Sequence, residues 1–173
     1  MMDEKTRESI LSRLSGYRYT HTLGCERAAR QLAFRFGYDP ERAGFAALLH
    51  DITKRLSKEE QLQLCEKYDI IPCDIEMREW KMLHGRTAAA IAAAEYGADS
   101  EICEAIAFHT TGRAEMTLLD KIIYLADYIE DTRDFDGVER ARELARDSLE
   151  RALLYCFDSS LADLIARNKL IHA

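Results

Sequence analysis

The sequence is poor in the residues that interrupt helices. Only two of its 173 residues are proline and eight are glycine. Proline and glycine are the residues most unfavourable inside a helix, and alanine, the most favourable, is abundant here. The composition therefore favours an all-α protein. A chain of this length can bury a substantial core by itself, so we expect a single domain over residues 1–173.

Long hydrophobic runs are also missing. No window approaches 18 uninterrupted apolar residues, which is about the length a membrane-spanning helix requires. The first eight residues, MMDEKTRE, are mostly charged and contain no apolar signal core. We therefore expect no membrane span and a cytoplasmic protein.

Paired cysteines are absent as well. The chain has five cysteines, an odd number without a CxxC spacing. This usage indicates reduced, mostly buried thiols of a cytosolic protein and does not favour zinc ligation by cysteine. The cysteines are Cys25, Cys65, Cys73, Cys103 and Cys156.

The chain has no excess of positive charge. It carries 24 basic and 31 acidic residues, a formal net charge of −7. Such a surface repels nucleic-acid backbones and anionic membranes, so we expect neither as a partner. A small phosphorylated substrate stays compatible, because it requires only a local basic pocket.

Hydrophobic periodicity and capping signals predict a succession of helices. Asp39 followed by Pro40 marks one helix start, and Ser57 with Glu60 forms a capping box at another. We expect a connection at residues 17–20 and an irregular segment with a short helix at 70–82. The predicted helices cover about 3–14, 20–36, 40–51, 57–68, 84–96, 100–109, 118–129 and 137–168, the last with a junction at Asp147-Ser148.

Four of the five histidines, with two aspartates, stand at or beside apolar helix segments. Imidazole and carboxylate groups are typical ligands of iron, manganese and zinc, and a carboxylate can bridge two ions. Taken singly, each residue has an ordinary explanation as a helix cap or dipole partner. Asp127 is the hardest to explain so, because it lies in a buried run without a cationic partner nearby. The set is His21, His50, Asp51, His84, His109 and Asp127.

The order of these residues resembles the HD superfamily of helical metal-dependent phosphohydrolases. It is most similar to the YqeK-type family of symmetrical dinucleoside tetraphosphate hydrolases. Four stretches carry the resemblance: LHDITK at 49–54, Leu83-His84, FHTTG at 108–112, and LDKIIYLADYIE at 119–130 followed by Arg133. The chain departs from the family pattern at Thr53, Ala88 and Asp131, none of which is a candidate ligand.

The resemblance implies an HD-domain helical bundle around a central dinuclear metal site. It implies two divalent metal ions, iron above all, with manganese or another transition metal as alternatives. The six residues above would be the ligands, with Asp51 as the bridge. The substrate would be diadenosine tetraphosphate, cut at its central bridge into two ADP by a hydroxide held between the metals.

Several residues are expected to contact the substrate. Lys54, one helical turn beyond His50, can reach phosphates as a mobile charge, and Arg133 offers a planar fork for two phosphate oxygens. We expect Asp51 and Lys54 to be catalytic. The terminal segment resembles the family segment that folds over the nucleotide. The expected substrate-binding set is Arg18, Lys54, Thr110, Thr111, Asp127, Arg133, Lys169, Leu170, Ile171 and His172; Tyr19 and Tyr128 are candidates for stacking on the base.

Other functions stay open from the sequence. An HD-type phosphatase could act on nucleoside monophosphates, deoxynucleoside triphosphates or guanosine alarmones, and a similar site can serve a di-iron oxygenase. A non-catalytic nucleotide sensor is a third alternative, although it would not require a complete ligand set. The sequence also leaves the base preference and a homodimer open.

Overall fold

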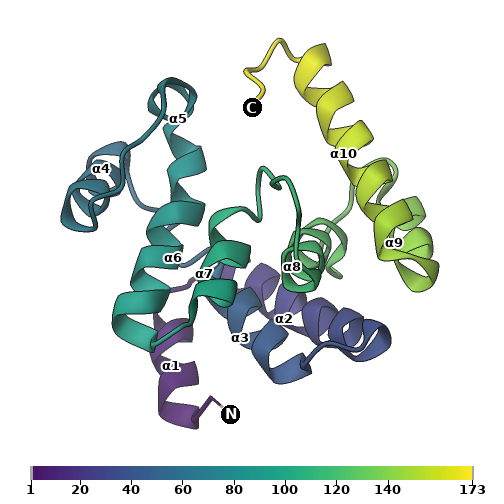
Figure 1. Ribbon diagram of the computed structural model, residues 1–173, viewed down its shortest axis with the longest axis horizontal. Coiled ribbons are helices and arrows are strands. Elements are labelled where there is room, and N and C mark those ends of the chain that lie inside the picture. Colours follow the sequence, from purple (N-terminus) through teal and green to yellow (C-terminus); the bar gives the residue numbers. More distant parts are fainter. Residues whose placement is uncertain (1, 173) are drawn as a thin grey trace.

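The computed structural model describes residues 2–172, which form helices and turns without a strand (Figure 1). The all-α fold expected from the composition is confirmed. None of the helices within these residues is long and apolar enough to cross a membrane. The elements are α1 (Glu4–Ser12), α2 (Tyr17–Phe36), α3 (Pro40–Leu49), α4 (Lys58–Lys67), α5 (Asp74–Arg78), the 3₁₀ helix η1 (Trp80–Met82), α6 (Leu83–Tyr96), α7 (Ser100–Ala107), α8 (Leu118–Ile129), α9 (Val138–Asp147) and α10 (Leu149–Ala166).

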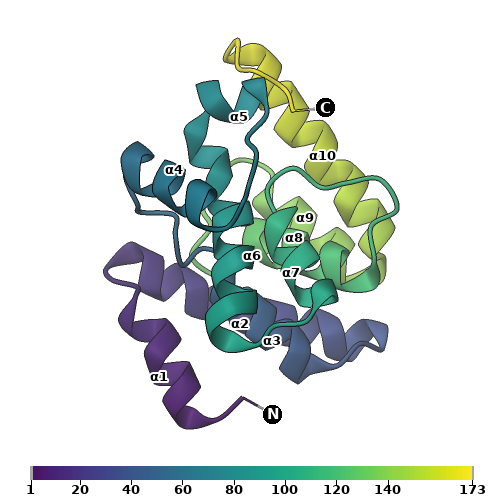
Figure 2. The same ribbon diagram turned by 60° about the vertical axis from the view of Figure 1, so that its left-hand side comes forward.

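Helix α2 lies at the centre of the packing, against α3 and α8, and α7 contacts both α6 and α8. Leu48 and Leu49 of α3 and Ile122 and Leu125 of α8 are fully buried in this core. Burial of each such side chain stabilises the fold by about 1.5–3 kcal/mol. Helices α1 to α3 lie at one end of the molecule, and α5 and the C-terminal end of α10 lie at the other (Figures 1 and 2).

Most helix starts follow their capping residues. The Asp39 carboxylate accepts the backbone N–H of Glu41 at 2.8 Å, and Ser57 and Glu60 form the expected capping box. Asp39 thereby fixes the start of α3, the helix that ends beside His50 and Asp51. The expected junction at Asp147-Ser148 is also present, because Ser148 caps α10.

One helix boundary differs from the expectation by more than two residues. Residues 17–20, expected as a connection, are the first turn of α2. The backbone N–H groups of Tyr19 and Thr20 bond back to the carbonyl of Gly16. The sequence did not predict this turn as helical, because Tyr17 and Tyr19 are 54% and 40% exposed and do not contribute to an apolar stripe. The helical start places Arg18 nearly one turn before His21.

Helices α6 and α7 approach closely where the chain enters α6. A Cβ atom at Gly85 would lie 2.7 Å from the carbonyl oxygen of Ala107, which is closer than real Cβ contacts. Only glycine therefore fits at this contact. The close approach brings His84, one residue before Gly85, next to His109, two residues after α7 ends.

The chain reverses after α10. Asn168 adopts a left-handed conformation with φ of 50°, and the backbone N–H of Lys169 bonds to the carbonyl of Leu164 at 2.9 Å. These two features define a Schellman motif, with asparagine in the position glycine usually occupies. The motif turns residues 169–172 back toward α5 and η1, where Lys169 lies 3.6 Å from the Glu79 carboxylate (Figure 2).

Candidate metal centre

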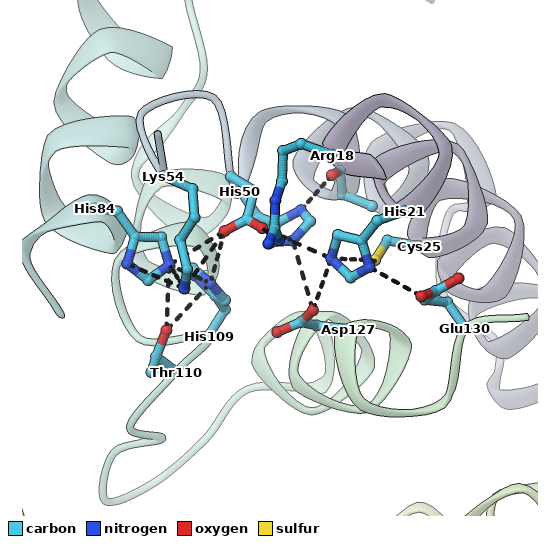
Figure 3. Close-up of polar contacts among 12 residues, drawn as sticks. Arg18, His21, Cys25, His50, Lys54, His84, His109, Thr110, Asp127 and Glu130 are labelled. Carbon is cyan, nitrogen blue, oxygen red and sulfur yellow. Dashed lines mark hydrogen bonds and ion pairs between the residues drawn. The ribbon is translucent and has the colours of Figure 1, made fainter. Parts of the chain in front are cut away.

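The six candidate ligands converge from five parts of the fold. His21 comes from α2, Asp127 from α8, His84 from the start of α6, and His50, Asp51 and His109 from the turns after α3 and α7. Figure 3 shows the imidazoles of His84 and His109 on one side of the site and His21 with Asp127 on the other. The four histidines and Asp51 are at most 2% exposed.

The two carboxylate oxygens of Asp51 face different histidines. Oδ2 lies 3.6 Å from Nε2 of His21 and 3.5 Å from Nε2 of His50. Oδ1 lies 3.2 Å from Nε2 of His84 and 3.7 Å from Nε2 of His109. The side chain thus stands between two pairs of nitrogens, which is the arrangement a bridging carboxylate requires.

Asp127 joins one of these pairs only. Its Oδ1 lies 3.0 Å from Nε2 of His21 and 3.8 Å from Nε2 of His50. The site is therefore divided into a half with two histidines and Asp127 and a half with two histidines alone. Each half also contains one oxygen of Asp51.

The hydrogen-bond partners of the Nδ1 atoms determine the tautomers of the four histidines. The Nδ1 atoms of His50, His84 and His109 lie 2.6, 2.6 and 2.7 Å from the backbone carbonyl three residues earlier. Nδ1 of His21 lies 2.9 Å from Oε1 of Glu130. Because these partners only accept, each Nδ1 carries the hydrogen, and each Nε2 keeps its lone pair toward the centre.

Two buried atoms of the centre lack a hydrogen-bond partner among the described residues, Nε2 of His50 and Oδ1 of Asp51. In addition, Nε2 of His84 and Nε2 of His109 face each other at 3.0 Å. Two facing lone pairs repel unless a cation lies near both, and two metal–nitrogen bonds of about 2.1 Å at a right angle span about 3.0 Å. These residues therefore fit divalent metal ions.

The charges of the site also suit metal binding. Burial lowers the pKa of His50 and of His84 to about 4, so both rings are neutral at pH 7. Burial alone would raise the pKa of Asp51, but the neighbouring His50, His109 and His84 outweigh it and hold this pKa well below its ordinary value. Neutral imidazoles and ionised carboxylates are the forms that bind metal.

Three basic side chains contact these groups. Arg18 pairs with Oδ2 of Asp51, Arg133 donates to Oδ1 of Asp127 at 2.6 Å, and Nζ of Lys54 lies 2.9 Å from Nε2 of His84 (Figure 3 labels Arg18 and Lys54). Burial lowers the pKa of Lys54. The structure thus brings three expected phosphate contacts to the candidate ligands.

Two details differ from the expectations. Asp127 was expected to be buried without a cationic partner. Its side chain is instead 23% exposed and pairs with Arg133. The turn at residues 130–133, which folds Arg133 back onto the end of α8, was not apparent from the sequence. Lys54 lies in a series of turns rather than on a continued helix, and its backbone N–H bonds to the carbonyl of Asp51.

Sequence reasoning missed Glu130, which holds His21. Its carboxylate also accepts from the backbone N–H and the hydroxyl of Thr132, and it is 1% exposed. The sequence feature that could have indicated Glu130 is a carboxylate directly after the buried run of α8. Gly24 makes room for it, because any Cβ there would overlap Oε2 of Glu130. Cys25 was also missed; its thiol lies 3.4 Å from Nε2 of His21, and burial raises its pKa.

Two adjoining cavities open beside the centre. The smaller, about 220 Å³, is lined by His109, Asp127, Tyr128 and Arg133 among others. The larger, about 480 Å³, shares Thr110, Tyr124 and Ser160 with it and extends between η1 and α10. Its lining includes Thr111 and four terminal residues, Lys169, Leu170, Ile171 and His172. We call the two cavities together the groove.

Two of the residues at which the chain departs from the family pattern make defined contacts. Asp131, where the family pattern has proline, points away from the centre and pairs with Arg27 at 3.0 Å, with its side chain 75% exposed. Thr53, where the pattern has alanine, donates to the backbone carbonyl of His84 at 2.9 Å. Thr53 thereby ties the turn after α3 to the start of α6.

The helical fold and this ligand set define a class of proteins. The model of the HD domain matches residues 18–132, which contain all six candidate ligands. The chain is thus an HD-domain protein, and this domain implies dependence on divalent metal.

Relatives define the family further. The symmetrical bis(5'-nucleosyl)-tetraphosphatases of Bacillus subtilis and Halalkalibacterium halodurans are each 36% identical to the chain, which they match over 98% and 97% of its length and 91% and 90% of their own. A Clostridium acetobutylicum crystal structure, described as a predicted HD superfamily hydrolase involved in NAD metabolism, has a TM-score of 0.93 at 37% identity, covering 99% of this chain and 92% of that one. The chain belongs to the family of these symmetrical tetraphosphatases, the YqeK-type HD hydrolases.

Removing the negative charge of Glu130, which lies beside Nδ1 of His21, should weaken metal binding. Glu130→Gln is expected to lower metal affinity about 10- to 100-fold, because the carboxylate orients the imidazole and raises its basicity. Gly24→Ala should act in the same direction by displacing Glu130. Metal affinity is measured by competition with a chelator, and thermal unfolding of the metal-free proteins reports any loss of fold.

The matched control is Glu66→Gln, which removes an exposed carboxylate on α4. It should leave metal affinity unchanged. Wild-type affinity in a folded Glu130→Gln variant would contradict the role of Glu130.

Proposed function

We propose that this protein hydrolyses dinucleoside tetraphosphates symmetrically, converting diadenosine tetraphosphate and water into two ADP. The observation that carries the proposal is the position of Asp51, whose two oxygens face two separate pairs of histidine nitrogens. This arrangement supports a site for two metals that opens onto a groove with basic side chains. The activity named for the relatives supports the choice of substrate.

Two divalent ions, iron in preference to manganese, are the proposed cofactors. Asp51 is the proposed shared ligand. The donors are nitrogen and oxygen atoms, which suit these metals. When bound, the ions activate water and neutralise phosphoryl oxygens. The other proposed ligands are His21, His50 and Asp127 in one half of the site, and His84 and His109 in the other.

The three basic side chains have a proposed second role. Arg18 and Arg133 pair with the two carboxylates, and Lys54 contacts His84. With the carboxylates and Nε2 of His84 engaged as metal ligands, these side chains would be available to bind phosphate oxygens. Arginine binds two such oxygens with its fork, and lysine acts as a point charge. Lys54 would then neutralise the negative charge that develops on the former bridging oxygen as ADP leaves.

The groove is the proposed nucleotide site. Thr110 and Thr111 line it and offer hydroxyl groups, while Trp80, Tyr124 and Phe157 also line it and offer aromatic faces on which a base could stack. The net charge of −7 disfavours polynucleotides and leaves a small nucleotide as the substrate class. The terminal residues Lys169, Leu170, Ile171 and His172 line the same groove. We therefore infer that residues 1–173 act as one HD domain, including the helices beyond residue 132.

The products test the reaction. The protein, loaded with iron or manganese under reducing conditions, is expected to give two ADP per diadenosine tetraphosphate, and hydrolysis in ¹⁸O-water should label one ADP of each pair. Chromatography and mass spectrometry measure both. AMP with ATP would overturn the symmetrical cut, and phosphate released from mononucleotides instead would indicate an HD-type phosphatase.

Loss of the shared ligand should remove both metals together. Asp51→Ala is expected to reduce bound metal below one ion per chain and to lower kcat by at least about three orders of magnitude, because catalysis depends on the ions. Elemental analysis and turnover measure this, and circular dichroism checks the fold. Substantial turnover with two bound metals would refute the bridging role.

Lys54→Met tests phosphate binding apart from metal binding. A lost charge-assisted contact of about 1.5–3 kcal/mol corresponds to roughly a 10- to 100-fold fall in kcat/KM. Metal content should stay at the wild-type value. Lys58→Met, at the exposed start of α4, is the control and should behave as wild type. Unchanged kcat/KM in Lys54→Met would exclude this contact.

A further inference from the structure

A second group of potential metal ligands lies away from the centre. Cys73 and Glu76 stand at the start of α5, and His172 stands 96 or more residues later in the terminal segment. One ligand atom from each side chain lies within 4.8 Å of the other two. This cluster involves none of the six ligands described above.

The separation within the cluster suits metal binding. Sγ of Cys73 lies 3.6 Å from Nε2 of His172. Two ligands bonded at about 2.3 Å for sulfur and 2.0–2.1 Å for nitrogen, at a tetrahedral angle, are about 3.6 Å apart. A thiol, an imidazole and a carboxylate together are a donor set that zinc accepts, with water as the fourth ligand.

Glu76 is held in place by its own contacts. Its Oε2 accepts the backbone N–H of Cys73 at 2.8 Å and the guanidinium of Arg86 at 2.9 Å. Neither contact uses Oε1, and the side chain is only 8% exposed. The carboxylate is thus fixed before any ion binds, which reduces the ordering cost of ligation.

The terminal segment is also positioned in advance. The Schellman motif at Asn168 directs it toward α5, and Lys169 lies 3.6 Å from Glu79. Residues 169–172, which follow α10, and η1, which follows α5, both line the groove. A contact between His172 and α5 therefore links the α10 side of the groove to the η1 side, its two walls.

We propose that Cys73, Glu76 and His172 form a site for a thiophilic divalent cation such as zinc, which ties the C-terminal segment to α5. Cys73 loses its thiol proton to solvent as the sulfur–metal bond forms, and His172 binds as the neutral ring. The bound ion holds the two walls together and slows passage of nucleotide through the groove. This last effect rests on the proposed function, whereas the site itself does not.

Cobalt(II) tests the site directly. Holoprotein carrying its resident metals is titrated with Co²⁺, and the near-ultraviolet sulfur-to-cobalt charge-transfer absorption is recorded. We expect saturation at one additional ion per chain and competition by Zn²⁺. The absorption should be lost in Cys73→Ser, strongly weakened in His172→Ala and unchanged in Cys103→Ser, which alters a half-buried thiol on α7.

The outcomes are distinct. No absorption in the wild type, or equal absorption in Cys73→Ser, would overturn the site and leave only a thiol–imidazole hydrogen bond. If the site is present and the protein hydrolyses tetraphosphates, zinc should lower kcat of the wild type severalfold and leave Cys73→Ser unaffected. Equal inhibition of both would reject the effect on the groove. A protein inactive on tetraphosphates would still give the absorption, so failure of the proposed function is recognisable separately.

Discussion

The structure depends on the buried carboxylate of Asp51. An ionised carboxylate that is 2% exposed is costly unless positive or donating groups surround it. Arg18 pairs with Oδ2 and Nζ of Lys54 lies 3.9 Å from Oδ1, whereas the four imidazoles face the carboxylate with Nε2 lone pairs, and Oδ1 has no hydrogen-bond partner among the described residues. The four imidazoles come from four different helices or turns, so the packing of these elements and the electrostatics of one carboxylate are inseparable. The same constraint makes the site complementary to divalent cations.

The four imidazoles are oriented in two ways, for one physical reason. His50, His84 and His109 stand at helix ends and use the backbone carbonyl three residues earlier. His21 lies inside α2, where the carbonyls of the preceding turn already serve the helix, so its ring requires a partner from outside. Glu130 is that partner, and it makes the orientation of His21 depend on the junction between α2 and α8.

What could be predicted from the sequence follows the range of the interactions. Helix starts at Asp39, Ser57 and Thr117 depend on bonds within three residues, and the sequence located all of them. The candidate ligands were found because histidine and aspartate are unusual beside apolar runs. The pairing of Arg133 with Asp127, the partner of His21 and the contact of Cys73 with His172 depend on how distant segments meet. No local sequence pattern predicts these long-range contacts.

The close fit of Gly24 against Glu130 has an evolutionary consequence. Position 24 appears in sequence as an ordinary small residue in a helix, and position 130 as a charge at the end of another. Because a Cβ at 24 would overlap the carboxylate at 130, position 24 cannot gain a side chain while Glu130 keeps its place. A position in α2 is therefore constrained by a residue more than a hundred positions later in the chain. A lineage that replaced this glycine would have to find another way to hold the first histidine.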